Sequence, residues 1–472
     1  MKLPLRVLAF LLTVVSGFDL HASTTEETLV HDSSGLVVRS ITLIGNKITR
    51  DGIVLRELSF SEGDTIVKRN LEARIKRSED NLFNTRLFNT VDITYLEDSG
   101  NVRLFVIMNE RWYIFPVPLI EVAERNFNAW WSTKDFSRLV YGVALNWRNV
   151  TGRNDLLVAT IRLGYYQRLS FSYSRPYIDK ARKIGLSCAM SYSRNHETNI
   201  ETVGNKQRNF KQEPGYVKED IGGGIGLTYR PGLYLTHSAE VGYRRTQVSD
   251  SVPLINPDYF GNGDSTQRFI SLRYAIRWNR LDITQFPTDG YYLEMEMNKV
   301  GLRPINDDVD LLYLVARMKK FWTPGTRWSL GTGISAKLSM PGYQPFYNTR
   351  ALGYGKDVVR GYEYYVVDGQ DFLLLKSSIR FALVPKKILH AGFVPSSKFN
   401  TIPLTVYAGV FADAGYVRDD QYAQGNPLTN TWQYGYGAGL ELFTAYDLIM
   451  RLEYSFNKLG ESGFFLHFTA PI

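Results

Sequence analysis

The residues that could carry out covalent chemistry are few in this chain of 472 residues. His196-Glu197 begins like a zinc-hydrolase motif, but no second histidine follows at the spacing that one helical face requires. The single cysteine, Cys188, alternates in phase with Leu186 and Met190, which predicts an inert side chain on an apolar face. The sequence contains no G-x-S-x-G elbow and no Walker A motif. We therefore predict that the protein is not an enzyme and uses no cofactor or metal.

Composition narrows the class of protein further. Aromatic residues make up 14% of the chain and charged residues only 22%, which excludes a disordered chain. The net charge of +8 is dispersed, without the basic face that binding to nucleic acid requires. After the first residues no apolar run approaches the length of about 18 that a membrane-spanning helix needs. A soluble β-rich protein or a membrane β-barrel remains.

The N-terminus indicates export from the cytoplasm. Lys2 and Arg6 precede an apolar stretch, and Ala22 and Ser23 offer small residues for cleavage. This order predicts a secretory signal peptide over residues 1–23. A polar linker, residues 24–35, is expected to follow it.

The next segment predicts a small domain of β-α-α-β-β order. Residues 37–44 are rich in β-branched side chains, which is typical of a strand. Thr49 is expected to cap a first helix. Val67, Leu71 and Ile75 recur on one face of a second helix, and two alternating strands complete the domain.

Residues 36–110 resemble a POTRA domain, the periplasmic module of outer-membrane assembly proteins. The resemblance rests on short motifs in a fixed order: Gly45-Asn46, Gly63-Asp64, Leu87-Phe88-Asn89 and Glu110. It implies a three-stranded sheet with an open edge, which can accept an extended client strand. A POTRA domain that only supports the barrel is an equal alternative.

From residue 111 to residue 472 the sequence alternates with a period of two. Leu272, Tyr274 and Ile276 fall on one face of a segment, and Arg273 and Arg277 fall on the other. Most such segments run for about ten residues and carry aromatic residues near their ends, which is typical of a membrane barrel. Sixteen segments begin near Trp112, Leu139, Asp155, Leu169, Lys183, Gly215, Leu233, Thr266, Gly290, Leu311, Arg327, Asp371, Thr401, Trp432, Asp447 and Gly463. The fold class is therefore mainly β, a 16-stranded antiparallel transmembrane β-barrel after one POTRA domain.

The lengths of the connections indicate which end of the barrel each one occupies. Connections after even-numbered segments are mostly short, as the periplasmic turns of such barrels are. Two connections do not follow this pattern: the third-to-fourth connection is short, and the connection of residues 384–400 is long.

Three motifs make the barrel similar to the BamA/TamA outer-membrane assembly family, the bacterial surface antigen superfamily. They are Val359-Arg360-Gly361-Tyr362 in a long connection, Phe411, Asp413 and Gly415 on a strand, and a turn with Asn279, Arg280, Phe286, Pro287 and Gly290. The resemblance implies that the connection folds into the lumen and that Arg360 reaches Asp413. Ser378 stands where this family often has a glutamate, two residues before Arg380, so we expect a simple Arg–Asp pair.

Two rows of glycines fit a loop that folds inward. They are Gly222, Gly224 and Gly226, and Gly435, Gly437 and Gly439. Each row removes side chains from one strand face and would let the loop approach the wall. Simple bending of the strands is an equal alternative.

The first and last strands are expected to meet at a weak seam. Pro116 and Pro118 remove backbone donors from the first strand. The last strand is short and alternates Phe464, Leu466 and Phe468 with other residues. The prolines could equally mark only the point where the chain enters the barrel.

The family resemblance implies a factor for assembly, insertion or translocation of proteins in the outer membrane of a Gram-negative bacterium, with the POTRA domain in the periplasm. Its expected partners are outer-membrane lipid, unfolded outer-membrane or secreted client proteins, and periplasmic accessory proteins, but not nucleic acid. The alternative is a passive pore or uptake channel, which an open lumen would favour. A single POTRA domain leaves open whether the protein is a central factor or an accessory one.

Overall fold

The computed structural model describes residues 35–123, 130–131, 134–302, 307–390, 399 and 401–469. The expected signal peptide and all of the expected linker except Gly35 lie outside these ranges. The described residues contain no helix that is both long and apolar enough to cross a membrane.

The N-terminal domain packs two helices on a small sheet. Its elements are β1 (Gly35–Ile44), α2 (Asp51–Glu57), β2 (Thr65–Val67), η1 (Lys68–Asn70), α3 (Leu71–Asn84), β3 (Phe88–Asp98) and β4 (Asn101–Glu110). The sheet order is β2-β1-β4-β3, with β1 and β4 parallel. Its core consists of side chains that alternate along the strands, such as Val102, Leu104 and Val106, and the helix residues Leu71 and Leu82.

Two details of this domain differ from the sequence-based expectations. The sheet has a fourth strand, because Thr65–Val67 pairs with β1, and Val67 therefore precedes α3 instead of belonging to it. Thr49 does not cap α2; the residue at the cap position is Arg50, which makes no side-chain cap. The Thr49 hydroxyl instead accepts a hydrogen bond of 2.9 Å from Asn149 in the barrel. The Thr49 hydroxyl, which the local pattern assigned to the helix cap, therefore makes a hydrogen bond to a distant part of the chain instead.

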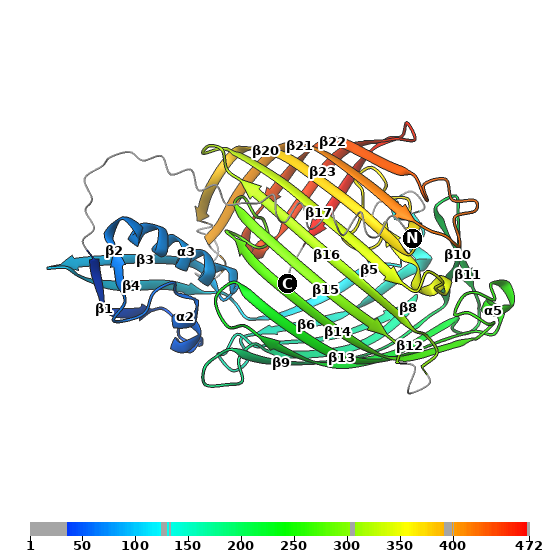
Figure 1. Ribbon diagram of the computed structural model, residues 1–472, viewed down its shortest axis with the longest axis horizontal. Coiled ribbons are helices and arrows are strands. Elements are labelled where there is room, and N and C mark those ends of the chain that lie inside the picture. The colour runs from blue at the N-terminus through cyan, green and yellow to red at the C-terminus, as the bar shows by residue number, and fades with distance from the viewer. Residues whose placement is uncertain are drawn as a thin grey trace.

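A 16-stranded antiparallel sheet forms the barrel, which confirms the expected fold class. Figure 1 shows the tilted strands. They are β5 (Ile114–Val122), β6 (Leu139–Arg148), β7 (Leu156–Gly164), β8 (Tyr166–Arg175), β9 (Ile184–Asn195), β12 (Lys218–Tyr229), β13 (Leu235–Val248), β14 (Thr266–Leu281), β15 (Gly290–Val300), β16 (Leu311–Trp322), β17 (Trp328–Met340), β20 (Asp371–His390), β21 (Thr401–Arg418), β22 (Trp432–Phe443), β23 (Ile449–Asn457) and β24 (Ser462–Thr469).

The two faces of the barrel wall separate as the alternation predicts. On β14, Leu272, Tyr274, Ile276 and Trp278 are exposed to the outside, whereas Ala275 between them is buried. On β23, Leu452 and Phe456 are exposed, whereas Glu453 and Ser455 are buried. The apolar face thus meets lipid, and the polar face meets the contents of the lumen.

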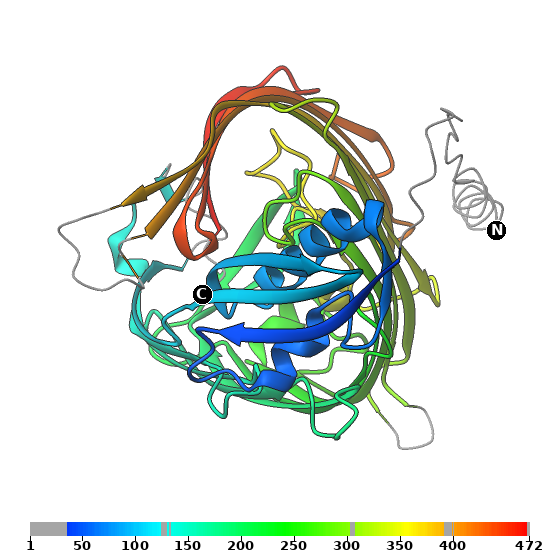
Figure 2. The same ribbon diagram turned by 90° about the vertical axis from the view of Figure 1, so that its left-hand side faces the viewer.

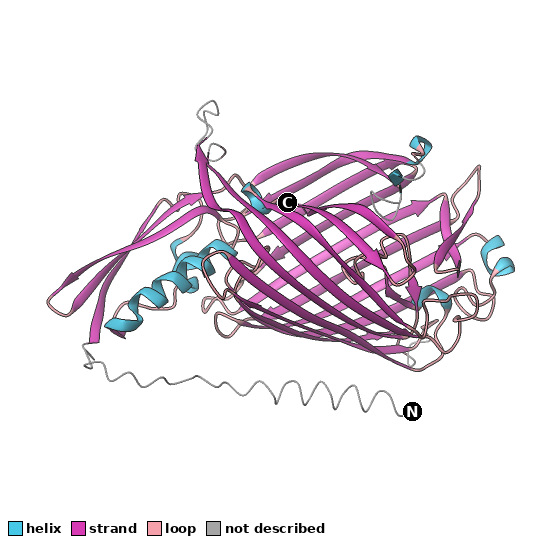
Figure 3. Cartoon of the chain, turned by 90° about the horizontal axis from the view of Figure 1, so that it is seen from above, coloured by secondary structure: helices cyan, strands magenta, loops and turns pink. Residues whose placement is uncertain are grey.

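The POTRA domain sits against one mouth of the barrel (Figures 1 and 2). The contacts involve turns that follow even-numbered barrel strands. Arg50 donates its backbone N–H to Gly152, and Asn84 donates to the carbonyl of Asp282 at 2.8 Å. Loops of the opposite mouth include a short helix, α5 (Ser251–Ile255) (Figure 3).

A hairpin covers part of that opposite mouth. It consists of β10 (Glu197–Val203) and β11 (Lys206–Lys211), within a connection that we expected only to be long. Asn205 in its turn is buried: its backbone N–H donates to Asn426, and its carbonyl accepts from Val366. An apolar cluster continues this cover across neighbouring loops: Ile200, Val217, Val248, Val252, Tyr259, Phe260 and Phe346.

Candidate functional site

The connection from β17 to β20, residues 341–370, folds into the barrel, and we call it the lumen loop. It contains η4 (Phe346–Asn348), β18 (Arg350–Leu352) and β19 (Val367–Asp368). Apolar side chains attach it to the wall of β20 and β21. They are Ala351, Leu352, Val359, Tyr362, Val367, Phe372, Leu374, Val417 and Leu428.

Arg360 and Asp413 are in contact. The Nε of Arg360 lies 2.9 Å from one carboxylate oxygen of Asp413, and its Nη2 lies 2.6 Å from the other. The backbone N–H of Arg360 also donates to Asp413, at 3.2 Å. Both residues are at least nine-tenths buried. This bidentate geometry is the strongest form of an arginine–carboxylate contact.

Two further groups hold the guanidinium of Arg360 in place. Its Nη2 donates to the carbonyl of Ser377 at 3.0 Å, and its carbon lies 3.9 Å from the centre of the Phe411 ring. Alternation on β21 directs Phe411, Asp413 and Gly415 to the same lumen face, where all three are buried.

One glycine of the row on β22, Gly435, lies where the loop approaches the wall most closely. A Cβ on Gly435 would lie 1.7 Å from the carbonyl oxygen of Arg360, and one on Gly415 would lie 2.6 Å from Val359. Gly361 itself has a φ of +91°, which favours glycine. The other row does not serve this purpose, since a Cβ on Gly222 would meet only the neighbouring strands.

The Arg–Asp contact is not the simple pair that we expected. Glu453 of β23 lies 3.8 Å from Nη1 of Arg360, and Lys376 of β20 lies 4.0 Å from Asp413. The family resemblance suggested position 378 as the place for a third charged residue, and Ser378 stands there. The carboxylate comes instead from another strand, as Glu453 of β23. The pair is thus part of a buried charge cluster.

The same cluster reaches the last strand of the barrel through His467. Nε2 of His467 lies 3.3 Å from Glu453 and 3.6 Å from Glu363 of the lumen loop. The other oxygen of Glu363 accepts the backbone N–H of Gly361 at 2.9 Å. Sequence reasoning placed His467 only on a strand, because nothing local links it to residues a hundred positions away. The one available signal was that His467 alternates with Leu466 and Phe468, which directs it to the opposite face of the strand.

The tip of the lumen loop also contacts the connection between β23 and β24. Asn457 donates its side-chain amide to the carbonyl of Gly361 at 2.9 Å. The Tyr362 hydroxyl accepts the backbone N–H of Lys458 at 3.1 Å. Three motif residues, Arg360, Gly361 and Tyr362, therefore contact β23 or the connection that follows it.

The two end strands of the sheet, β5 and β24, define the seam. Among the described residues no ladder joins them, whereas each pairs with its inner neighbour, β6 or β23. Phe464 and Phe468 are more than half exposed on the outer face of β24. Leu466 shares their phase, and the predicted seam residues of the last strand thus lie on the side of the lipid.

Pro116 and Pro118 lie on the outer face of β5, and their positions leave the β5–β6 ladder intact. The carbonyl of Tyr113 accepts from Arg148, and the N–H of Ala123 donates to Arg138, so odd-numbered residues of β5 direct their backbone groups toward β6. Even-numbered residues direct theirs toward the seam. The two prolines therefore remove donors from the seam edge alone.

The turn between β14 and β15 inserts into the lumen at the end that faces the N-terminal domain. Phe286 stacks on Phe443 at 5.7 Å, and the Arg380 guanidinium lies 4.6 Å from the Phe286 ring. Arg380 also donates to the carbonyl of Pro287 at 2.7 Å. A Cβ on Gly290, where φ is +100°, would lie 2.1 Å from the carbonyl of Arg280.

Asn279 and Arg280 stabilise the base of this turn. Asn279 accepts the backbone N–H of Leu281 at 3.2 Å, and the guanidinium of Arg280 lies 5.4 Å from the Tyr234 ring. From the N-terminal domain, Asn84 of α3 accepts the N–H of Thr284 at 2.8 Å. The turn thus connects the POTRA domain with the lumen.

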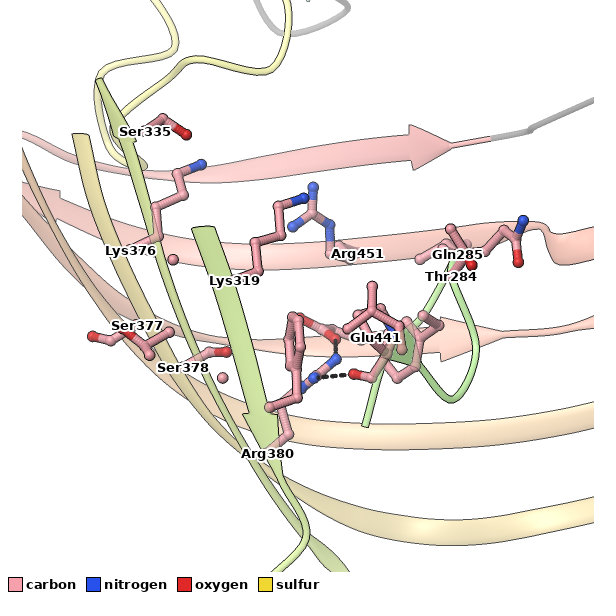
Figure 4. Close-up of a pocket in the computed structure, with 18 of the residues that line it drawn as sticks. Thr284, Gln285, Lys319, Ser335, Lys376, Ser377, Ser378, Arg380, Glu441 and Arg451 are labelled. Atoms are coloured by element: carbon pink, nitrogen blue, oxygen red, sulfur yellow. Dashed lines mark hydrogen bonds and ion pairs between the residues drawn. The ribbon is translucent and has the colours of Figure 1, made fainter. Parts of the chain in front are cut away.

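A cavity of about 340 Å³ separates this turn from the lumen loop. Figure 4 shows Lys319, Lys376, Arg380 and Arg451 around it, with Glu441 beside Arg380. Arg360 also lines the cavity. The charged side chains that line this cavity are therefore mainly positive.

An ionic contact also holds the POTRA domain to the barrel. Arg230, in the turn after β12, contacts both oxygens of Glu57 at 2.6 and 2.8 Å. Tyr177 donates to Glu57, and burial together with that carboxylate raises the pKa of Tyr177. Arg56 donates to the carbonyls of Arg182, Arg230 and Gly232. The domain is thereby fixed in one orientation.

Comparisons with known proteins agree with this architecture. Residues 149–463 match the family model of the Omp85 superfamily domain, and residues 36–111 match the POTRA model, described as a surface antigen variable number repeat. No curated protein matches the chain.

Two solved structures share the fold. BamA from Haemophilus ducreyi lacking POTRA domains 1–3 is 16% identical, with a TM-score of 0.50 over 92% of this chain and 84% of that one. CdiB from Escherichia coli is 12% identical, with a TM-score of 0.55 over 92% of this chain and 76% of that one.

Proposed function

The chain belongs to the Omp85 superfamily, whose members act in the insertion or translocation of proteins at the outer membrane, and we propose that it handles unfolded client proteins there. The clients are outer-membrane or secreted proteins, which periplasmic accessory proteins can deliver. The POTRA domain lies in the periplasm and the barrel in the outer membrane. No covalent step is part of the proposal.

The observation that carries the proposal is the seam. Within the described chain, β5 and β24 share no ladder, although every other pair of neighbouring barrel strands does. Unpaired backbone groups are costly in hydrocarbon, so an extended client strand can pair with an end strand and pass into lipid. The lumen loop occupies the barrel interior, which favours this sideways route over an axial one.

The POTRA sheet supplies a first contact for the client. β3 is the edge strand of the order β2-β1-β4-β3, and no described strand pairs with its outer side. The opposite edge is partly covered, since β2 pairs with three residues of β1. We therefore assign client binding by β-augmentation to β3.

The lumen loop couples the wall to the seam. Arg360 attaches it to Asp413 on β21, and Glu363 brings it to His467 on β24. A client strand that displaces β24 also disturbs this cluster. The loop is thus suited to hold the seam in one state until a client arrives.

Client folding into liposomes tests the proposal. A urea-denatured outer-membrane barrel would be diluted into liposomes with or without the full chain, and its folding would be followed by the heat-dependent shift on a gel. We expect faster folding with the protein and a reduced effect with Arg360→Ala. Arg273→Ala is the matched control, because Arg273 also faces the lumen but pairs with Glu296 of β15 and not with a residue of the lumen loop.

Conductance of the same preparation separates the proposal from a passive pore. An assembly factor with an occupied lumen is expected to conduct poorly. Large, steady conductance without faster client folding would contradict the proposal and establish a pore instead.

A further inference from the structure

A second lumen cavity lies at the periplasmic base of the seam. Its volume is about 380 Å³. Residues of the first three barrel strands and of the turn before β23 line it, so it spans both sides of the seam. They are Arg86, Arg111, Trp112, Phe115, Asn146, Arg148, Leu156, Val158, Tyr446 and Asp447.

The charges around this cavity do not balance. Three arginines line it, and Asp447 is the one carboxylate among the described lining residues. Arg111 contacts both oxygens of Asp447, at 2.9 and 3.2 Å. Arg86 lies 3.8 Å from the same carboxylate. The carboxylate is therefore already engaged, and a positive charge remains.

Arg148 carries that excess charge. It is the last residue of β6 and shares the lumen-facing phase of Val140 and Ala144. Among the described residues, none lies within hydrogen-bond or ion-pair distance of its guanidinium. A cation held beside two other arginines without an anion of its own is costly unless a ligand supplies the anion.

The rest of the cavity is apolar. The rings of Phe115 and Tyr446 meet edge to face at 5.3 Å, and Leu156 and Val158 line the same space. Arg148 ends β6 and Leu156 begins β7, so the cavity lies at the level where the strands leave the membrane. Aromatic side chains and basic pockets at this level are typical of contacts with lipid headgroups.

We propose that this cavity binds the phosphate group of an anionic phospholipid from the periplasmic leaflet, which reaches it through the seam. Arg148 and Arg86 contact the phosphate, and Phe115 and Tyr446 pack against the adjoining apolar part of the lipid.

The number of donors favours a phosphate over a client carboxylate. One arginine satisfies one carboxylate in a bidentate contact, as Arg111 does for Asp447. A phosphate offers more acceptor oxygens and can use two further guanidinium groups. A carboxylate ligand would be satisfied by Arg148 alone and would make no use of Arg86.

Native mass spectrometry of the full chain in detergent tests this proposal, with phosphatidylglycerol as the anionic lipid and phosphatidylethanolamine as the zwitterionic one. We expect preferential binding of phosphatidylglycerol, about tenfold weaker in Arg148→Gln. Arg148→Lys is expected to retain most of the binding. The matched control is Arg168→Gln: Arg168 is also a lumen-phase arginine without an ion-pair partner among the described residues, but it lies outside this cavity.

Competition distinguishes the possible sources of the anion. Inorganic phosphate that displaces the lipid at equal concentration would overturn the assignment to a phospholipid. So would a client peptide that binds through its terminal carboxylate, loses affinity in Arg148→Gln and displaces the lipid. Equal loss of lipid in Arg148→Gln and Arg168→Gln would also reject the site.

Discussion

Strands β20 and β21 run for 20 and 18 residues, whereas β5 and β24, the two ends of the same sheet, run for 9 and 8. The long strands carry Asp413 and pair along most of their length. Among the described residues, the short ones pair with a neighbour on one side only, and the nitrogens of the two prolines of β5 face the other side. A single barrel thus contains a region that holds a loop and a region that lacks a ladder, and buried charges connect them.

The largest effect is expected at Gly435, where the lumen loop approaches the barrel wall most closely. Gly435→Ala places a Cβ against the carbonyl oxygen of Arg360, and neither backbone can move without displacing the loop. We expect the substitution to destabilise the bound position of the lumen loop by more than about 4 kcal/mol. Limited proteolysis of the loop and the client-folding assay measure it.

Gly222→Ala is the control for that substitution, since its Cβ would meet no atom closer than 3.5 Å. It is expected to change stability by less than about 0.5 kcal/mol. Equal protease resistance of the loop in both variants would show that the glycine row has no part in seating it.

The Arg360–Asp413 contact is expected to give the next largest effect. Arg360→Ala and Asp413→Ala each leave a buried charge without its main partner, at a cost of about 3–5 kcal/mol. The double variant should be little worse than either single variant, in client folding and in urea denaturation. Clean additivity in this double-mutant cycle would reject the coupling.

His467 tests whether the loop and the seam communicate. His467→Phe removes the contacts to Glu363 and Glu453, and we expect the backbone amides of β24 to open more readily by about 1–3 kcal/mol. Hydrogen exchange measures this opening. His237→Phe is the control, because His237 is half-buried on β13 and contacts Tyr274 instead. Unchanged exchange in β24 would separate the two regions.

Substitution of the β5 prolines is expected to give the smallest effect. Its sign is opposite to that of the other variants, because it strengthens a contact instead of removing one. Pro116→Ala or Pro118→Ala restores one donor at the seam edge, which strengthens pairing there by about 0.5–1.5 kcal/mol. Client folding should slow accordingly, by a few-fold. Pro231→Ala, in a turn far from the seam, should leave the rate unchanged. Faster folding in the β5 variants would mean that the prolines do not weaken the seam.

Much of this fold could be predicted because alternation is a local signal. All sixteen barrel strands begin within three residues of the predicted positions, since each strand must alternate by itself to separate lipid from lumen. β2 was missed because three residues are too few to show a period. The hairpin of β10 and β11 was missed because its packing depends on distant loops.

The candidate site was only partly accessible from the sequence. The resemblance placed Arg360 beside Asp413, but Glu363, Glu453 and His467 come from a loop and two strands that only the barrel brings together. The two glycine rows look alike in sequence, yet of the six glycines only Gly435, on β22, lies against the loop. Strand register across the sheet decides this, and no local pattern encodes it.

The contact between Arg111 and Asp447 has a mechanical consequence. Arg111 precedes β5 and Asp447 precedes β23, so the ion pair pins the two sides of the seam together at the periplasmic end. Displacement of β24 from β5 then grows with distance from this pin, as in a hinged lever. We expect the gap to be narrowest where a client arrives and widest at the outer surface, so that a strand held at its base is released from the top downward.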